Sequence, residues 1–395
     1  MPRSGTSRCP VVYHRRMGLL RFAPQPAQAS HRGTTPLELL FDLAAVVAIG
    51  AAARGLALGI ADGNGGAATV AFLCSFFMVW WAWMNFTWFA SAYDDDSTTF
   101  RILSMAMMFG ALMLAAGVEA VFAREPIWLA LSGFIVMRLA LTLMWCAVAR
   151  GDPDRRTTAL CYACGIIGMQ GYWIALVAIA APGSVWYTPL FALGVAGELA
   201  VPAVAERRGP TPWHRHHIAA RYGRLNLIVL GQAFLAVVTA IELAPGAAFP
   251  HAGRLAQAAS FAIVAFAMWS LYFPGDARPP GDRLGRALLW GYGHFAVFGA
   301  AAAAGAGMQA ILLPGSGAGR AGTLVMMASV AVYVAALWLI RDRYARTGTG
   351  RWHGLAVAML AIIAIGDPAM ALPGTALTLA CLATANRRAA ERVPA

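Results

Sequence analysis

The amino-acid sequence predicts an all-α fold, a polytopic transmembrane helix bundle of about 12 spans. Of its 395 residues, 59% are hydrophobic and only 12% are charged, and the mean hydropathy is +0.62. Soluble domains carry about a quarter charged residues. Apolar stretches close to the length of a bilayer span recur along the chain, and arginines gather in the short segments between them. These observations exclude a soluble enzyme, a disordered protein and a coiled coil.

The apolar stretches, separated by Gly, Pro and charged residues, predict the helices in order. They cover residues 37–60, 67–92, 101–123, 127–149, 159–181, 186–205, 225–244, 255–273, 286–308, 321–340, 352–366 and 369–386. The first ten reach or approach the roughly 20 residues that cross a bilayer. The last two are shorter and are divided by Asp367 and Pro368, which end one helix and begin the next. They fit two thin spans or one re-entrant hairpin, so totals of ten or eleven spans stay open.

The start of the first helix carries two acidic side chains. In residues 34–38, Thr35 fits the N-cap, Pro36 the first helical position, and Glu38 the third position of a capping box. Asp42 lies one turn deeper on the same helix face as Glu38 and has no capping role. A charge within a span costs roughly 2.5–3.5 kcal/mol. Glu38 and Asp42 are therefore candidates for a cation or proton site, with capping (Glu38) and a structural ion pair (Asp42) as the alternatives.

The second helix is rich in aromatic residues, namely Trp80, Trp81, Trp83, Trp88 and, at its end, Tyr93. Trp and Tyr favour the membrane interface. Trp80 and Trp81 lie too deep for an interfacial belt alone, so we expect them to pack against neighbouring helices. The run Asp94–Asp96 that follows could bind a divalent cation, but capping of the helix that begins near Ser97 is the favoured interpretation.

The arginines predict the orientation in the membrane. The sequence contains no Lys, so all 30 basic residues are arginine. If the N-terminus is cytoplasmic and the chain alternates sides, 25 arginines fall inside, Arg124, Arg254 and Arg320 fall outside, and Arg54 and Arg138 lie within spans. This division follows the positive-inside rule. It predicts a multi-pass membrane protein with both termini cytoplasmic, and it makes membrane orientation, not nucleic-acid binding, the reason for the net charge of +12.

The predicted domains follow from the same map. They are a disordered basic cytoplasmic arm (1–33), a first six-helix half (34–206), a basic cytoplasmic loop (207–224), a second six-helix half (225–386) and a cytoplasmic tail (387–395). No cleavable signal peptide is expected, because the apolar patch of the arm, residues 17–20, is too short. The halves fit two parallel repeats, since six is an even number. A shift of 190 residues then places Asp42 on Gln232.

Further polar residues fall inside the predicted spans. Arg138 and Glu198 both lie near mid-helix, and as neighbours they would form a buried ion pair. His294 lies about two turns into its helix, where a single satisfied hydrogen bond and a proton relay are both open. The candidate ion, proton or substrate path therefore comprises Glu38, Asp42, Arg138, Glu198, Gln232 and His294.

No catalytic, metal or cofactor site is predicted. Cys161 and Cys164 form a C-x-x-C pattern without a second pair, which favours small-residue packing, and the six cysteines suggest reduced thiols. The cluster His214–His217 is expected in a solvated loop, since metal oxygenases of membranes need several separated histidine boxes. The chain shows no nucleophile–His–acid pattern and no phosphate-binding Gly loop, which argues against an enzyme.

Several motifs resemble those of the bacterial low temperature requirement protein A family. The run from Thr35 to Leu43 is similar to the family's opening Pro-Leu-Glu-Leu-Phe-Phe-Asp-Leu, with Leu40 in place of the first Phe. Further matches are Trp80–Trp83, Tyr93-Asp94, Asp96, Arg221-x-Gly223, Leu230-Gly231 and Tyr292-x-His294. The resemblance covers about residues 33–386, and it departs where Tyr222 replaces a common His and Gln232 a common Glu. It implies a multi-pass inner-membrane protein, in a family named for a growth phenotype.

Two classes of function stay open. The leading hypothesis is a transporter or channel that moves a small solute or ion, linked to H⁺ or another cation. A shorter likeness, of Phe41-Asp42-Leu43 to the Phe-Ser-Asp start of potassium channels built from six-helix units, points the same way. The alternative is a membrane-embedded sensor or scaffold, or a lipid-modifying enzyme, because polar residues in spans also hold helices together. Expected partners are the lipid bilayer and a small solute or ion, with an oligomer compatible and no nucleic acid.

Overall fold

The computed structural model describes residues 21–24, 34–242, 251–273, 284–314, 317–344, 350–365 and 368–391. These residues form α-helices with short connections and contain no strand, which confirms the all-α class. The first half contains α1 (Pro36–Ala61), α2 (Gly65–Tyr93), α3 (Thr98–Ala123), α4 (Trp128–Gly151), α5 (Arg156–Ile179) and α6 (Tyr187–Ala205). The second contains α7 (Arg215–Val229), α8 (Gly231–Ile241), α9 (Ala252–Tyr272), α10 (Leu284–Leu312), α11 (Ala318–Ile340), α12 (Gly350–Ile365) and α13 (Pro368–Glu391).

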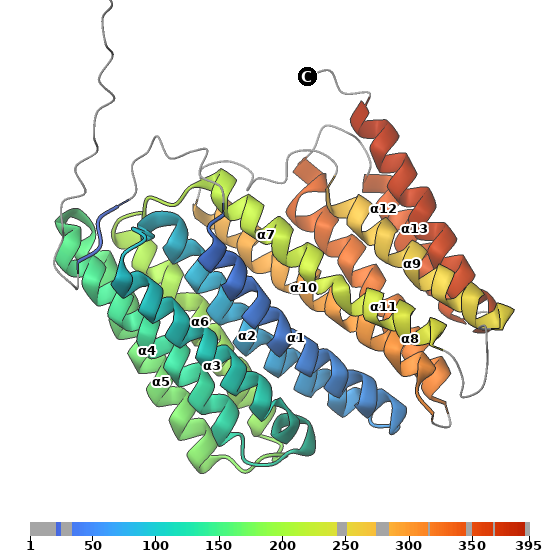
Figure 1. Ribbon diagram of the computed structural model, residues 1–395, viewed down its shortest axis with the longest axis horizontal. Helices are drawn as coiled ribbons and strands as arrows, with labels where there is room; N and C mark the ends of the chain where they lie inside the picture. Colours follow the sequence, from blue (N-terminus) through green and yellow to red (C-terminus); the bar gives the residue numbers. More distant parts are fainter. Residues whose placement is uncertain are drawn as a thin grey trace, which may run out of the picture.

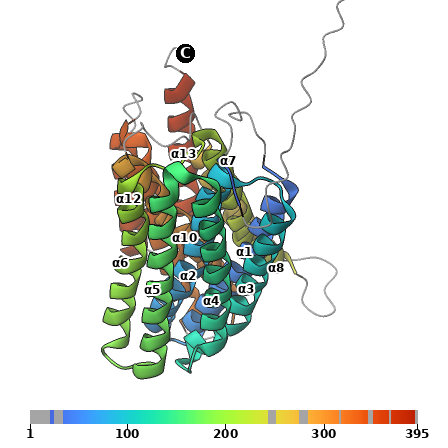
Figure 2. The same ribbon diagram turned by 90° about the vertical axis from the view of Figure 1, so that its left-hand side faces the viewer.

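Ten helices of the described ranges are long and apolar enough to cross a membrane, with α7 and α8 counted as one continuous span, Arg215–Ile241. The helices α12 and α13 follow them and make about 12 spans compatible with the structure. Figure 1 shows one group of helices, α1–α6, beside a second group, α8–α13. The two groups meet at α1 and α2 of the first and α10 of the second, and α7 also lies at this boundary. In both views the helices run side by side along one direction (Figure 2).

The helices of the two halves pack in the same order. In the first half α1 contacts α2 and α3, and then α3–α4, α4–α5 and α5–α6 pair in turn. In the second half α8 contacts α9 and α10, and then α10–α11, α11–α12 and α12–α13 pair. The two parallel repeats expected from the sequence require this correspondence. The halves meet mainly where α1 packs against α10, α11 and α7.

Glycine pairs permit the closest helix contacts in each half. A Cβ atom added at Gly110 of α3 would lie 2.6 Å from the carbonyl oxygen of Gly133 on α4. A Cβ atom added at Gly307 of α10 would lie 2.7 Å from the carbonyl oxygen of Gly322 on α11. Small residues at such crossings let helix backbones approach in the membrane, where packing contributes much of the association.

We therefore expect Gly110→Val to lower the free energy of unfolding by about 1–3 kcal/mol, the usual cost of overpacking a tight contact. Thermal unfolding of the purified protein in detergent measures this as a lower Tm. The matched control is Gly66→Val, because a Cβ atom added at Gly66 meets nothing within 4 Å. Equal Tm values for the two variants would contradict the close crossing of α3 and α4.

Two predicted helix starts are confirmed. The Thr35 hydroxyl accepts from the Glu38 backbone N–H at 3.3 Å, and the Glu38 carboxylate accepts from the Thr35 backbone N–H at 2.9 Å, which completes the capping box. The Ser97 hydroxyl caps α3 by accepting from the Phe100 backbone N–H at 3.1 Å. These local patterns depend on a few neighbouring residues, so the sequence predicts them well.

The predicted loop 207–224 is wrong from Arg215 onward, because α7 begins there. Residues 215–224 are too polar for an apolar-stretch criterion to detect a helix. His217 is nevertheless buried and Arg221 is 0% exposed, because their side-chain nitrogens face carboxylates from the first half of the chain. The expectation that His217 lies in a solvated loop is corrected for the same reason.

Part of the N-terminal arm, expected to be disordered, is ordered. Phe22 is 1% exposed and makes edge contacts with the rings of Phe89 and Phe100, with centroids 6.0 and 6.2 Å apart. Its backbone N–H donates to the Ala147 carbonyl at 3.3 Å. The other predicted arm residues, 1–20 and 25–33, lie outside the described residues.

Candidate functional site

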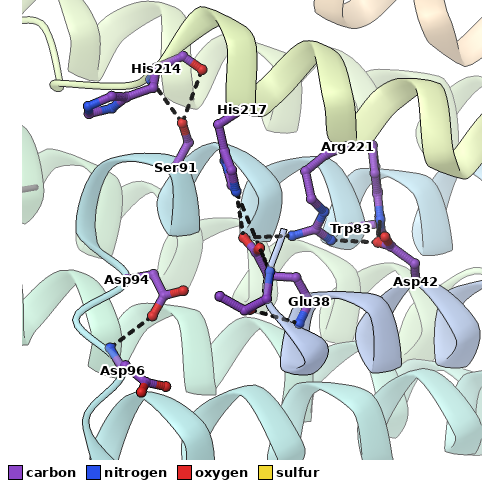
Figure 3. Close-up of polar contacts among 10 residues, drawn as sticks. Glu38, Asp42, Trp83, Ser91, Asp94, Asp96, His214, His217 and Arg221 are labelled. Atoms are coloured by element: carbon purple, nitrogen blue, oxygen red, sulfur yellow. Dashed lines mark hydrogen bonds and ion pairs between the residues drawn. The ribbon is translucent and has the colours of Figure 1, made fainter. Parts of the chain in front are cut away.

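The two acidic residues of α1 face two basic residues of α7. Glu38 and Asp42 are one turn apart on α1, and His217 and Arg221 are one turn apart on α7, so the two pairs match in spacing. The His217 Nε2 atom lies 3.1 Å from Glu38 Oε1. The two guanidinium NH groups of Arg221 lie 3.2 Å from Glu38 Oε1 and 2.5 Å from Asp42 Oδ1 (Figure 3). We call these four residues the interhalf network.

The interhalf network is buried, and a tryptophan adds further contacts to it. Glu38, Asp42 and Arg221 are 0% exposed. The Trp83 indole N–H on α2 donates to Asp42 Oδ1 at 2.7 Å, and the Arg221 guanidinium lies 5.7 Å from the Trp83 ring centroid. An indole N–H stabilises a carboxylate, and the ring face stabilises a cation. Trp83 thus stabilises both members of the Asp42–Arg221 pair.

The charges of the interhalf network balance only with one bound proton. Two carboxylates face one guanidinium, which stays charged, and one histidine, which is charged only when protonated. An unbalanced buried charge is costly. The Asp42 Oδ2 atom accepts no hydrogen bond from the described residues, so it is a free position for a proton. One proton, carried by His217 or by a carboxyl, would make the network neutral.

A second buried network lies inside the first half. The Arg138 guanidinium on α4 donates to Glu198 Oε2 on α6 at 2.6 Å, and both side chains are 0% exposed. The indole N–H of Trp81 on α2 donates to the same oxygen at 2.8 Å, and that of Trp173 on α5 donates to Glu198 Oε1 at 3.0 Å. The carboxylate thus has three donors from three helices. Arg138 and Glu198 form the buried ion pair that their mid-helix positions suggested.

Helix α2 joins the two networks through its tryptophan run. Trp81 binds Glu198 and Trp83 binds Asp42, and side chains two apart lie on nearly opposite sides of a helix. Packing of Trp80 and Trp81 against neighbouring helices was expected from the sequence, but these hydrogen bonds were not. The signal was present, since a carboxylate inside a span needs a donor and an indole N–H is a donor that an apolar helix can carry.

His294 lies apart from both networks. Its Nδ1 atom is 2.7 Å from the Trp290 carbonyl oxygen, and its Nε2 atom is 3.0 Å from the Tyr272 hydroxyl oxygen. A neutral imidazole that donates from Nδ1 to the carbonyl and accepts at Nε2 from the hydroxyl satisfies both contacts. This geometry matches the alternative of a satisfied histidine, and among the described residues no hydrogen bond or ion pair joins His294 to Glu38 or Asp42.

Gln232 does not join the other candidates either. It lies half-buried on α8, and its backbone carbonyl accepts from the Gln309 side chain at 3.4 Å. The six candidates thus divide into the pair Glu38 and Asp42, the pair Arg138 and Glu198, and two separate residues. The residues that sequence analysis missed are His217, Arg221, Trp81, Trp83 and Trp173.

The acidic run after α2 has structural contacts. Asp94 accepts from the Asp96 backbone N–H at 2.9 Å, and Asp96 forms an exposed ion pair with Arg101 at 2.8 Å. Within the described part of the chain, no group of three or more His, Cys, Asp or Glu side chains is placed to hold a metal ion. Cys161 and Cys164 carry free thiols.

Comparison with known proteins identifies the family. A family model described as bacterial low temperature requirement A protein (LtrA) matches residues 33–386, nearly the whole chain. This match confirms the family that the motifs resemble. Comparisons with curated proteins and with solved structures give no match.

Proposed function

The chain belongs to the bacterial low temperature requirement A family and is a multi-pass membrane protein, and we propose that it moves a small solute or ion across the membrane with a proton as the coupling ion. Under this proposal it is a transporter and catalyses no chemical reaction. The observation that carries the proposal is the interhalf network, because its carboxylates come from one half of the chain and its bases from the other.

Proton binding would change the contact between the halves. With Asp42 ionised, its ion pair with Arg221 holds α1 to α7. A proton on Asp42 would remove the charge that Arg221 pairs with, and the cost of separating the two helices would fall. Transporters built from repeats work by rocking one unit against the other around a central site. A proton can shift such an equilibrium only by binding one arrangement better than the other, and under this proposal the network is the group whose proton affinity differs between the two.

We propose that the network lies toward the cytoplasmic side of the cell membrane. Glu38 is in the first turn of α1, and Arg150, Arg155, Arg156, Arg207 and Arg208 lie at the ends of α4, α5 and α6 that share this level. Arginine-rich segments favour the cytoplasm. Both termini would then be cytoplasmic, and the network would close the cytoplasmic entrance in the present arrangement.

Flux into liposomes containing the purified protein tests the proposal. We expect proton-dependent flux for the wild type, with K⁺, Na⁺ and H⁺ gradients screened in turn, and flux reduced at least tenfold in Asp42→Asn. The matched control is Asp62→Asn, because Asp62 is exposed at the opposite end of the same helix. Voltage-following current without coupling would indicate a channel instead.

A well-folded sample that moves none of these ions would contradict ion-coupled transport. Normal folding together with unchanged behaviour of Asp42→Asn would favour the scaffold alternative, in which the buried polar groups only hold helices together.

A further inference from the structure

A cavity of about 250 Å³ opens in the first half, at the end of the bundle opposite to the start of α1. Helices α2 to α6 line it, together with the segments that join α3 to α4 and α5 to α6. The residues that matter for its chemistry are Ala71, Ser75, Trp173, Tyr187, Thr188 and Phe191. The Arg138–Glu198 network lies directly behind the cavity wall, since Trp173 lines the cavity and donates to Glu198.

Ser75 brings an unsatisfied hydroxyl to this cavity. It is 3% exposed, and its Oγ atom has no hydrogen-bond partner among the described residues. Several other helical hydroxyls of this chain bond to the carbonyl four residues before, as Ser104 and Thr142 do at 2.8 Å. Because Ser75 lacks that bond, its hydroxyl is available to a molecule in the cavity. A buried polar group without a partner is costly, so a ligand that supplies one gains free energy.

The cavity favours an uncharged ligand. The charged residues that line it are Arg124 and Glu125, both exposed in the segment between α3 and α4 and opposite in sign. The deeper wall is apolar and aromatic, and Glu198 behind it is already paired with Arg138. An apolar cavity of 150 Å³ holds benzene, so this volume suits a solute of about ten non-hydrogen atoms.

We infer that this cavity binds a small uncharged solute with an apolar body and one hydrogen-bonding hydroxyl or amide, which pairs with the Ser75 hydroxyl. The solute would rest against the Trp173 ring, and through the Trp173 indole it would act on Glu198 and then on α2. The inference names the class of solute that the transporter would carry, and in this respect it rests on the proposed function.

Binding of 4-fluorobenzyl alcohol and of 4-fluorotoluene, followed by fluorine NMR, tests the inference. The full-length protein is placed in lipid nanodiscs, and uptake by empty nanodiscs is subtracted. We expect saturable binding of both probes by the wild type. Ser75→Ala should weaken binding of the alcohol about two- to tenfold, the value of one hydrogen bond, and leave binding of fluorotoluene unchanged. Ser132→Ala is the matched control, because the half-buried Ser132 hydroxyl bonds to the Trp128 carbonyl outside the cavity.

A second variant blocks the cavity. Ala71 lies one turn from Ser75 on α2 and also lines the cavity, so Ala71→Phe should weaken both probes at least tenfold. Unchanged binding of both probes by a folded Ala71→Phe protein, or equal losses for the two probes in Ser75→Ala, would overturn the inference. The assay uses no ion gradient. Binding without any flux would therefore support the site and contradict the transport proposal, whereas flux without binding would do the reverse.

Discussion

Replacing Arg221 by methionine is expected to lower the free energy of unfolding by about 3–5 kcal/mol, the usual cost of removing one partner of a buried ion pair. The change would leave Glu38 and Asp42, both 0% exposed, without their shared guanidinium. Glu38 would keep the His217 ring and the Thr35 backbone N–H as partners, and Asp42 would keep only the Trp83 indole N–H. Thermal unfolding in detergent at constant pH measures the loss as a lower Tm.

The matched control for this experiment is Arg156→Met, because Arg156 is exposed at the start of α5 and exposed arginines contribute about 0–1 kcal/mol. The double variant Arg221→Met with Asp42→Asn removes one of the charges left behind, so it should recover part of the lost stability. If the single variant and the control unfold at the same temperature, the interhalf network does not hold the two halves together.

Replacing Arg138 by methionine is expected to cost a similar 3–5 kcal/mol, because Glu198 would stay buried without a countercharge and with only two indole donors. The double variant Arg138→Met with Glu198→Gln should be much more stable than the single variant. The amide oxygen introduced by Glu198→Gln can still accept from an indole N–H of Trp81 or Trp173, and no net charge stays buried. Tm values of the wild type, both single variants and the double variant complete a double-mutant cycle.

The expected outcome of this cycle is a coupling energy well above 1 kcal/mol. Arg124→Met is the matched control, since Arg124 is an exposed arginine of the same half. If the stability losses of the two single variants simply add in the double variant, Arg138 and Glu198 do not interact in the purified protein. The cycle therefore separates a true ion pair from two residues that are each needed for folding.

The same variants separate transport from a scaffold role. In a scaffold, any loss of flux in a variant should only accompany a loss of stability, seen as a lower Tm. In a transporter, Asp42→Asn should lose flux with little loss of stability, because Arg221 keeps Glu38 as its countercharge and asparagine still accepts the hydrogen bond from Trp83. A measurement of flux and Tm on one set of samples makes this comparison direct.

Much of the fold could be predicted because it depends on local composition. The bilayer requires about 20 apolar residues per span, so the helices up to α6 and from α9 to α11 lie close to where hydropathy placed them. The capping box at Thr35 and Glu38 depends on four adjacent residues. Helix α7 was misplaced because residues 215–224 are polar, and only their contacts with α1 make a buried helix there favourable.

The candidate site could be predicted in part. A charged residue inside an apolar span can be recognised as a candidate because inserting its charge into the membrane costs free energy. Asp42, Arg138 and Glu198 became candidates in this way. Their partners were less visible, because Arg221 and His217 lie in a polar segment that suggests a loop. The roles of Trp81 and Trp83 were hidden because a tryptophan has the same apolar pattern whether or not its N–H meets a carboxylate.

The sequence by itself determined the class of the protein, its apolar spans, its family and most of the charged residues that must be buried. The tertiary structure alone decided which of these residues meet: Asp42 with Arg221, 179 positions apart, and Arg138 with Glu198, 60 positions apart. The physical reason is that the free-energy cost of burying a charged side chain depends on that residue and its apolar neighbours, so it can be recognised from the sequence. The compensating charge comes from another helix, and its position is set only when the helices pack.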